Sequence, residues 1–160
     1  MKTPLTTFVL AAACIVSAAC GGRKAVQINP GAQPVGIRWN AVLATPAAMA
    51  GVLQMRGTGW MAPLEGNAEQ TSAFATITNA TPGGEHPWHV HLGRCGTDRG
   101  VFGPPGSYGI LKVGRSGTAE GSATIPVPAP TSGEYFINVH ASRENMGTIV
   151  ACGNLAPPSR

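Results

Sequence analysis

The chain has 160 residues, a net charge of +4 at pH 7 and 11% charged residues. Apart from the pair Arg23-Lys24, its lysines and arginines are spread singly and form no run, so the charge gives no reason to expect a nucleic-acid partner. The length suits one domain with one hydrophobic core. The 22 glycines and 14 prolines, without a long amphipathic helix pattern, predict an all-β domain.

The first 19 residues have the features of an export signal. Lys2 supplies the positive start, residues 5–16 form an apolar run, and small residues then lead to Cys20. The apolar run is too short to be a stable membrane-spanning helix. We therefore expect residues 1–19 to be a signal peptide that is removed from the mature protein.

The residues around Cys20 resemble the lipobox of bacterial lipoproteins, in which the leader is cleaved before a cysteine that then carries lipid. Ser17 stands where that family usually has leucine, so simple secretion with cleavage nearby is the alternative. Acylation would anchor the chain stably, since stable anchoring takes about two chains. Gly21 is not the aspartate that resembles an inner-membrane retention signal, which favours the outer membrane or the cell surface. Residues 20–36 are predicted to be a flexible tether.

Short strands separated by turn residues are expected over the rest of the chain, as in a Greek-key sandwich or barrel. The domain is predicted to cover residues 37–156, with a tail at 157–160. Loops are expected at 60–66 and 96–109, and residues 81–84 (Thr-Pro-Gly-Gly) form a strong turn signal. The expected strands are residues 37–43, 51–56, 71–79, 110–113, 118–127, 135–140 and 149–155, with one more around His89.

Two histidines alternate in the strand around His89. Side chains of an extended strand point alternately to opposite faces. His89 and His91 therefore emerge on one face, and Trp88 and Val90 on the other. Trp88 and Val90 can then serve the core, while the two imidazoles stand together on the outer face.

A third imidazole comes from the strand at residues 135–140. Alternation there turns Tyr135, Ile137 and Val139 inward and His140 outward. Two outward histidines on one strand and one on another are how a sheet presents a metal site. The alternative is that the histidines are scattered over a surface and serve solubility.

The cysteines divide between leader and domain. Cys14 lies inside the discarded leader and Cys20 would be lipidated, so the mature domain keeps Cys95 and Cys152. In an exported domain two cysteines most simply form one disulfide. The alternative is that both are metal ligands, although neither belongs to a C-x-x-C pair.

Three motifs resemble those of the Cu,Zn superoxide dismutase superfamily. They are His86-x-Trp88-His89-Val90-His91 with Cys95 soon after, Asn138-Val139-His140, and Ala151-Cys152-Gly153. The resemblance implies a Greek-key β-sandwich or barrel with a copper site. By position, His89, His91 and His140 match the copper ligands of that family. His86 matches a histidine that supports the backbone near the site without binding metal.

The same resemblance implies a structural disulfide between Cys95 and Cys152, but the family's zinc ligands are missing. Residues 96–109, which correspond to the zinc loop, contain no histidine, and their one acidic residue is Asp98. No zinc is therefore expected, and the histidine that bridges copper and zinc in that family is missing too. Arg143, in a shortened loop, either replaces the family's guiding arginine or is an ordinary solvated side chain.

These motifs leave three functions open. The first is a copper-only superoxide dismutase, with copper on the three imidazoles and Arg143 guiding superoxide. The second is a copper-binding lipoprotein for buffering or delivery, held at the membrane by lipid on Cys20. The third is a structural or interaction domain without metal, because the His140 strand also resembles the chordin-type (CHRD) repeat. A further ligand or guiding charge at the site would distinguish the dismutase from the copper-binding lipoprotein, and Glu85 and Asp98 are the candidates for it.

Overall fold

The computed structural model describes residues 37–158. The predicted signal peptide, the predicted lipidation site at Cys20 and the predicted tether lie outside these residues. No helix between residues 37 and 158 is long and apolar enough to cross a membrane.

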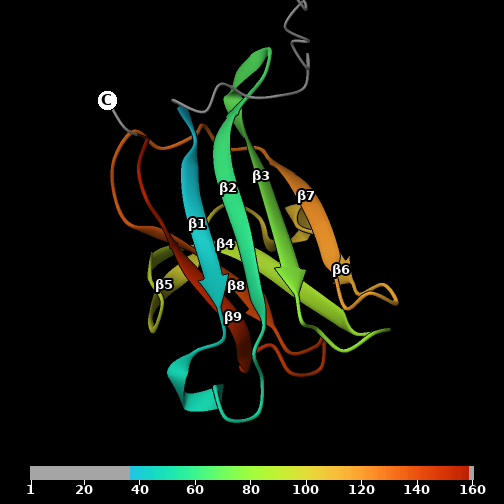
Figure 1. Ribbon diagram of the computed structural model, residues 1–160. Coiled ribbons are helices and arrows are strands. Elements are labelled where there is room, and N and C mark those ends of the chain that lie inside the picture. The colour runs from blue at the N-terminus through green and yellow to red at the C-terminus, as the bar shows by residue number, and fades with distance from the viewer. Residues whose placement is uncertain (1–36, 159–160) are drawn as a thin grey trace, which may run out of the picture. The chain divides into compact units, whose positions relative to one another are not determined.

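The described residues form an all-β domain, as the composition predicts. Eight strands make one antiparallel sheet in the order β5-β4-β8-β9-β1-β2-β3-β7, and the short β6 pairs with the start of β4. The sheet curls into a half-barrel (Figure 1). The strands are β1 (Trp39–Ala44), β2 (Arg56–Leu64), β3 (Asn67–Thr78), β4 (Glu85–Arg94), β5 (Thr97–Val101), β6 (Ile110–Lys112), β7 (Ala119–Ile125), β8 (Tyr135–His140) and β9 (Ile149–Leu155). Two short 3-10 helices, η2 (Ala47–Met49) and η3 (Pro105–Ser107), lie in the connections.

One face of the curled sheet carries the hydrophobic core. Trp88 and Val90 of β4 and Ile137 and Val139 of β8 are fully buried there, as their alternation predicts. Each large apolar side chain buried in this way contributes roughly 1.5–3 kcal/mol to folding. The core therefore holds β4 and β8 in a fixed register, and their opposite faces become a rigid platform.

The sequence prediction is wrong around β2. Of residues 51–56, expected as a strand, 51–52 form a turn, 53–55 have no regular structure and Arg56 begins β2. Residues 60–66, expected as a loop, are mostly strand. Gly57 and Gly59 lower the β propensity of this segment. The sequence therefore gives only a weak strand signal there. Packing requires a glycine at position 59, because a Cβ there would overlap the side chain of Ile137 and lie 2.7 Å from the carbonyl oxygen of Phe74.

β5 is a second strand that the sequence prediction missed, because residues 96–109 are expected to be a loop. This strand lies at the edge of the sheet beside β4, and most of its side chains are exposed. An exposed edge strand lacks the apolar alternation by which strands are recognised. The hairpin that it forms with β4 is tied to β9 by a disulfide.

The disulfide joins Cys95, in the β4–β5 turn, to Cys152 in β9. It confirms the predicted pairing and removes the alternative in which both cysteines are metal ligands. Because disulfides form and persist in oxidising compartments, it indicates an extracytoplasmic location for the domain.

Candidate metal centre

The antiparallel pairing of β4 with β8 brings three histidines together on one face of the sheet. His89 lies opposite Asn138 in this pairing, and His140 is the last residue of β8. The alternation is as predicted, but the face is not an open surface. His89, His91 and His140 are only 8%, 4% and 5% exposed. The loops that cover them turn a predicted surface cluster into a buried one.

The three rings converge. One nitrogen of each of His89, His91 and His140 lies within 4.8 Å of the others. The Nδ1 atom of His89 is 3.1 Å from Nε2 of His140, and the centre of the His91 ring is 5.7 Å and 5.9 Å from those two rings. Metal–imidazole bonds of about 2 Å place ligand nitrogens up to about 4 Å apart, so side-chain shifts of roughly 1 Å would complete the site.

Hydrogen bonds determine which nitrogen is free in two of the rings. The Nδ1–H group of His140 donates to the carbonyl oxygen of Met146 at 2.6 Å, which leaves the lone pair on Nε2. The Nδ1–H group of His91 donates to Oδ1 of Asp98 at 2.9 Å, which again leaves the lone pair on Nε2. Outer hydrogen bonds of this kind orient the histidine ligands of metal sites.

The free nitrogen of His91 is the least satisfied atom of the cluster. Its Nε2 is buried and has no hydrogen-bond partner among residues 37–158. A buried acceptor without a partner costs about 1–3 kcal/mol, so proteins rarely keep one without a use for it. A cation between the three rings would satisfy this atom.

The contact between His89 and His140 requires a hydrogen on one of the two facing nitrogens. Because Nε2 of His140 carries a lone pair, the Nδ1–H group of His89 donates to it across 3.1 Å. The same space suits a metal cation once the proton of His89 has moved to its own Nε2. The ligand set is then Nδ1 of His89 with Nε2 of both His91 and His140.

Burial keeps the rings of His89 and His140 neutral. Desolvation, followed by the neighbouring charges of His140 and His91, lowers the pKa of His89 from 6.5 to about 4. Burial likewise lowers the pKa of His140. Neutral imidazole is the form that binds metal, so burial favours the metal-binding form of these two rings at pH 7.

Asp98 supplies the charge nearest to the cluster. Partial burial by itself would raise the pKa of this carboxyl group, but the hydrogen bond from the backbone N–H of Gly100 and the contact with His91 outweigh burial and lower it. Asp98 is therefore a carboxylate at neutral pH, in contact with one candidate ligand.

Two aromatic rings flank the cluster. Tyr108 meets His89 nearly edge-on with the ring centres 5.2 Å apart, and Phe136 lies 5.2 Å from His91 at an interplanar angle of 30°. The hydroxyl group of Tyr108 donates to the carbonyl oxygen of Phe102 at 2.7 Å, which holds its ring in place. Burial raises the pKa of Tyr108, so its ring stays uncharged. The two rings keep water from these sides and limit rotation of the imidazoles.

His86 contacts the backbone beside the cluster. Its Nδ1–H group donates to the carbonyl oxygen of His140 at 3.0 Å, which ties the start of β4 to the end of β8. His86 does not belong to the cluster of converging nitrogens. Its predicted role, support of the backbone without metal binding, stays a prediction that this contact suits.

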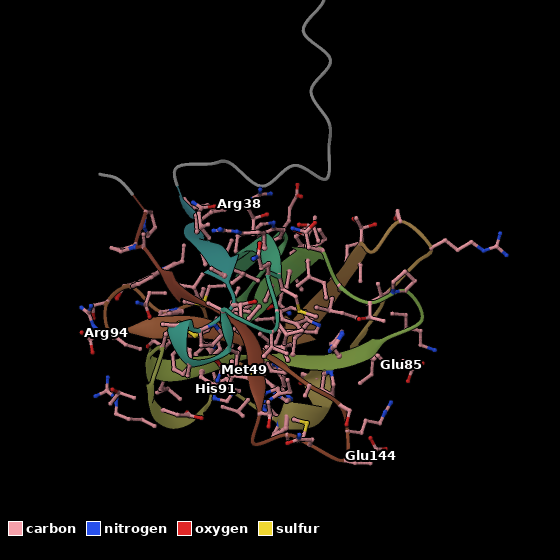
Figure 2. All side chains as sticks on the ribbon, turned by 60° about the horizontal axis from the view of Figure 1, so that its bottom comes forward. Arg38, Met49, Glu85, His91, Arg94 and Glu144 are labelled. Carbon is pink, nitrogen blue, oxygen red and sulfur yellow. A yellow bond between two sulfur atoms is a disulfide. The ribbon has the colours of Figure 1, made fainter. Side chains whose placement is uncertain are left out.

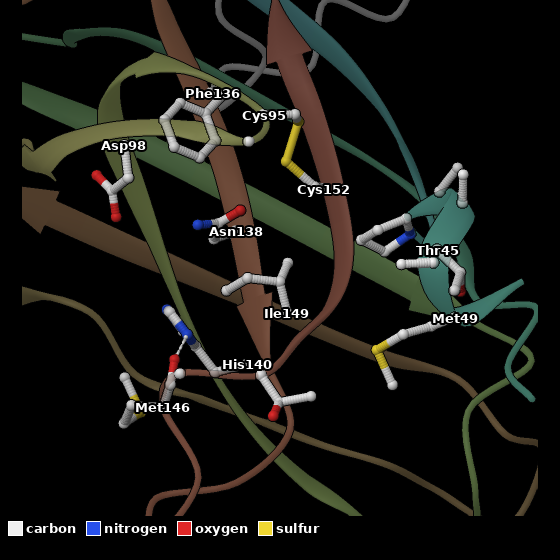
Figure 3. Close-up of a pocket in the computed structure, with 17 residues that line it drawn as sticks. Thr45, Met49, Cys95, Asp98, Phe136, Asn138, His140, Met146, Ile149 and Cys152 are labelled. Atoms are coloured by element: carbon white, nitrogen blue, oxygen red, sulfur yellow. Dashed lines mark hydrogen bonds between the residues drawn. A yellow bond between two sulfur atoms is a disulfide. The ribbon is translucent and has the colours of Figure 1, made fainter.

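A pocket of about 860 Å³ opens beside the cluster. Figure 3 shows His140, Asp98, Asn138 and Met146 among the residues that line it. The Oδ1 atom of Asn138 is buried without a hydrogen-bond partner in the described part of the chain. Much of the remaining wall is apolar, and a small molecule in the pocket would lie against His140, which is part of that wall.

Two other residues singled out from the sequence lie away from the cluster. Arg143 is exposed and does not line the pocket, so its guiding role stays a prediction. Glu85 faces Lys112 at 3.6 Å, and Figure 2 shows it at the periphery, apart from His91. Of the two acids considered as a further ligand or guiding charge, only Asp98 touches one of the three histidines.

Several parts of the site are not identified by the sequence analysis. Phe136 and Asn138 could have been found, because strand alternation places them on the face of His140. Tyr108 and the carbonyl group of Met146 come from loops, and no pattern in the sequence points to either.

Three imidazoles beside a pocket form a donor set that zinc, copper, iron and nickel all accept. No protein-family model matches this chain, and no curated protein matches it in sequence. The case for a metal centre therefore stands on the geometry of the three rings.

Proposed function

We propose that this protein binds one copper ion at His89, His91 and His140. The observation that carries the proposal is the buried Nε2 of His91, which has no hydrogen-bond partner in the part of the chain that the structure describes and belongs to a cluster whose ligand nitrogens lie within 4.8 Å of one another. A metal-free role as a structural or interaction domain would leave that nitrogen unsatisfied. Histidines kept for solubility would be exposed.

Copper is the metal that the donor set and the motifs favour together. A given nitrogen site binds Cu²⁺ more tightly than the other divalent first-row metals, zinc included. The resemblance of the histidine motifs to the Cu,Zn superoxide dismutase superfamily points the same way. The curled antiparallel sheet and the disulfide suit a divergent, zinc-free member with a Greek-key barrel. When bound, copper supplies one-electron redox chemistry, and the chain orients its ligands and limits access of water.

Copper buffering or delivery is the role that the charges around the site support best. The carboxylate of Asp98, next to His91, attracts cations and repels an anion such as superoxide. Arg143, the predicted guide for superoxide, is exposed and outside the pocket. Superoxide dismutation is the second candidate, and the pocket that reaches His140 favours it because it gives a small anion access.

The protein is further proposed to act in the bacterial cell envelope, anchored by lipid on Cys20. Its support is the disulfide between Cys95 and Cys152, which belongs to an oxidising compartment, together with the lipobox-like leader. An outer-membrane or cell-surface position fits Gly21 after the lipidated cysteine.

Copper loading followed by a superoxide-decay assay tests the proposal. The purified protein should bind one copper ion, and His140→Ala should lose at least 100-fold in affinity because one of three ligands is gone. Glu120→Gln, an exposed substitution on β7, should bind copper as the unchanged protein does.

The outcomes separate the candidates. Bound copper without accelerated superoxide decay supports buffering or delivery and excludes the enzyme. Accelerated decay that is lost in Arg143→Ala supports dismutation. Failure to bind stoichiometric copper, or normal binding by His140→Ala, contradicts the proposed site.

A further inference from the structure

Asp98 lies where it can control one ligand of the proposed copper site. Its Oδ1 accepts hydrogen bonds from His91 Nδ1 at 2.9 Å and from the backbone N–H of Gly100 at 2.8 Å. The His91 side chain is 5% exposed and that of Asp98 50%, so the carboxylate faces solvent on its other side. One side of the carboxylate is therefore solvated while the other acts on a buried ring.

The position of this carboxylate is fixed by the fold. Asp98 lies opposite Gly93 in the β4–β5 pairing, and Gly93 has a positive φ of 106° that favours glycine. Cys95, three residues before Asp98, is tied by the disulfide to Cys152. The disulfide thus fixes the turn of the β4–β5 hairpin, and the pairing of Gly93 with Asp98 fixes its register. Together they hold Asp98 against His91.

We propose that Asp98 is a positioning residue that fixes His91 with its proton on Nδ1 and biases the proposed copper site toward Cu(II). The inference rests on the proposed copper site. A carboxylate that accepts from the outer nitrogen of a ligating histidine sets the tautomer of the ring and raises the basicity of the inner nitrogen. The added negative charge stabilises a doubly charged ion more than a singly charged one.

Two substitutions separate the hydrogen bond from the charge. Asp98→Asn keeps an oxygen that can accept from His91 and Gly100 but removes the negative charge. Asp98→Ala removes both. Glu120→Gln is the matched control, because it removes an exposed carboxylate from β7, at the opposite end of the sheet order from β5.

The measurement is the affinity of each variant for Cu(II) and for Cu(I), with the reduction potential of the bound ion. Asp98→Asn should bind Cu(II) about tenfold more weakly and Cu(I) almost unchanged, which raises the potential by about 59 mV. Asp98→Ala should lose 10- to 100-fold in Cu(II) affinity. Glu120→Gln should leave both affinities unchanged.

Nitrogen-15 NMR of the metal-free protein gives a readout that needs no copper. His91 should be neutral with its proton on Nδ1, and Asp98→Ala should convert it to a mixture of the two tautomers. Normal copper binding with an unchanged Cu(II) to Cu(I) affinity ratio in Asp98→Asn, or an Nε2–H tautomer of His91, overturns this inference alone. A protein that binds no copper overturns the proposed function and this inference together.

Discussion

The proton balance of His89 makes the stability of the metal-free protein depend on pH. Its pKa is about 4 in the folded chain, against 6.5 for an ordinary histidine. Between these values the unfolded chain binds more protons than the folded one, so protonation favours unfolding. The contribution of His89 to the free energy of unfolding is fully present above pH 6.5. It is lost as the pH falls toward 4, and the loss amounts to about 3 kcal/mol at most.

Urea unfolding of the metal-free protein at pH 7 and pH 5 measures this effect. We expect a lower free energy of unfolding at pH 5, and a smaller difference in His89→Gln, which has no titrating ring. His140 contributes in the same direction, because burial lowers its pKa as well. If the unchanged protein and His89→Gln lose the same free energy of unfolding between pH 7 and pH 5, the assignment of this ring as buried and neutral is contradicted.

At the scale of the strands, the close packing of β2 against β3 and β8 predicts an unequal response of two glycines. A Cβ at Gly59 would overlap Ile137 and lie 2.7 Å from the Phe74 carbonyl oxygen, whereas one at Gly51 meets nothing within 4 Å among residues 37–158. Gly59→Ala should cost about 1–3 kcal/mol of unfolding free energy, and Gly51→Ala less than about 0.5 kcal/mol. Denaturant titration of both variants measures this, and equal stabilities would argue against the placement of β2.

The disulfide links the stability of the domain to its metal site. Cys95 and Cys152 are 57 residues apart, so replacing both with serine should cost about 4 kcal/mol by loop entropy. Copper affinity should fall in the same variant, because the hairpin that holds Asp98 against His91 loses its tether.

Copper titration of the folded double variant, at a temperature where it remains native, checks this link. Arg94→Ala is the matched control, since it breaks an exposed ion pair with Glu134 on the same hairpin and should leave copper affinity unchanged. Unaltered copper affinity without the disulfide would mean that β4 and β5 hold Asp98 without help.

The sequence predicts strands well where alternation and burial coincide. The faces of β4 and β8 follow from a period of two, which places Trp88 and Val139 in the core and the histidines opposite them. β2 and β5 are not predicted, because their residues do not show the alternation of apolar and polar side chains. Gly59 is required by close packing across the sheet, and the exposed edge strand β5 buries almost nothing.

The candidate site shows the same division. The types and the spacing of His89, His91 and His140 suffice to predict that they share a face. Their burial does not follow from β4 and β8, because loops distant in sequence supply Tyr108 and the Met146 carbonyl oxygen. Strand patterns therefore predict which histidines lie together. The loops determine how far the cluster is buried from water and how firmly its rings are held.

At the scale of the whole domain, the curled sheet acts as a frame for a buried cation site. One face of β4 and β8 is anchored in the core, and the other holds three imidazoles in place. A ligand that binds the folded chain and not the unfolded one stabilises it, by about 2.7 kcal/mol at a free concentration 100 times its Kd. Copper should therefore raise the melting temperature of the protein, and should not raise that of His140→Ala.

The most direct test of the copper site is a crystal structure of the copper-loaded protein with anomalous diffraction recorded at the copper absorption edge. We expect one strong peak about 2 Å from Nδ1 of His89 and from Nε2 of both His91 and His140. A peak elsewhere, or three rings that remain without an ion under saturating copper, would contradict it.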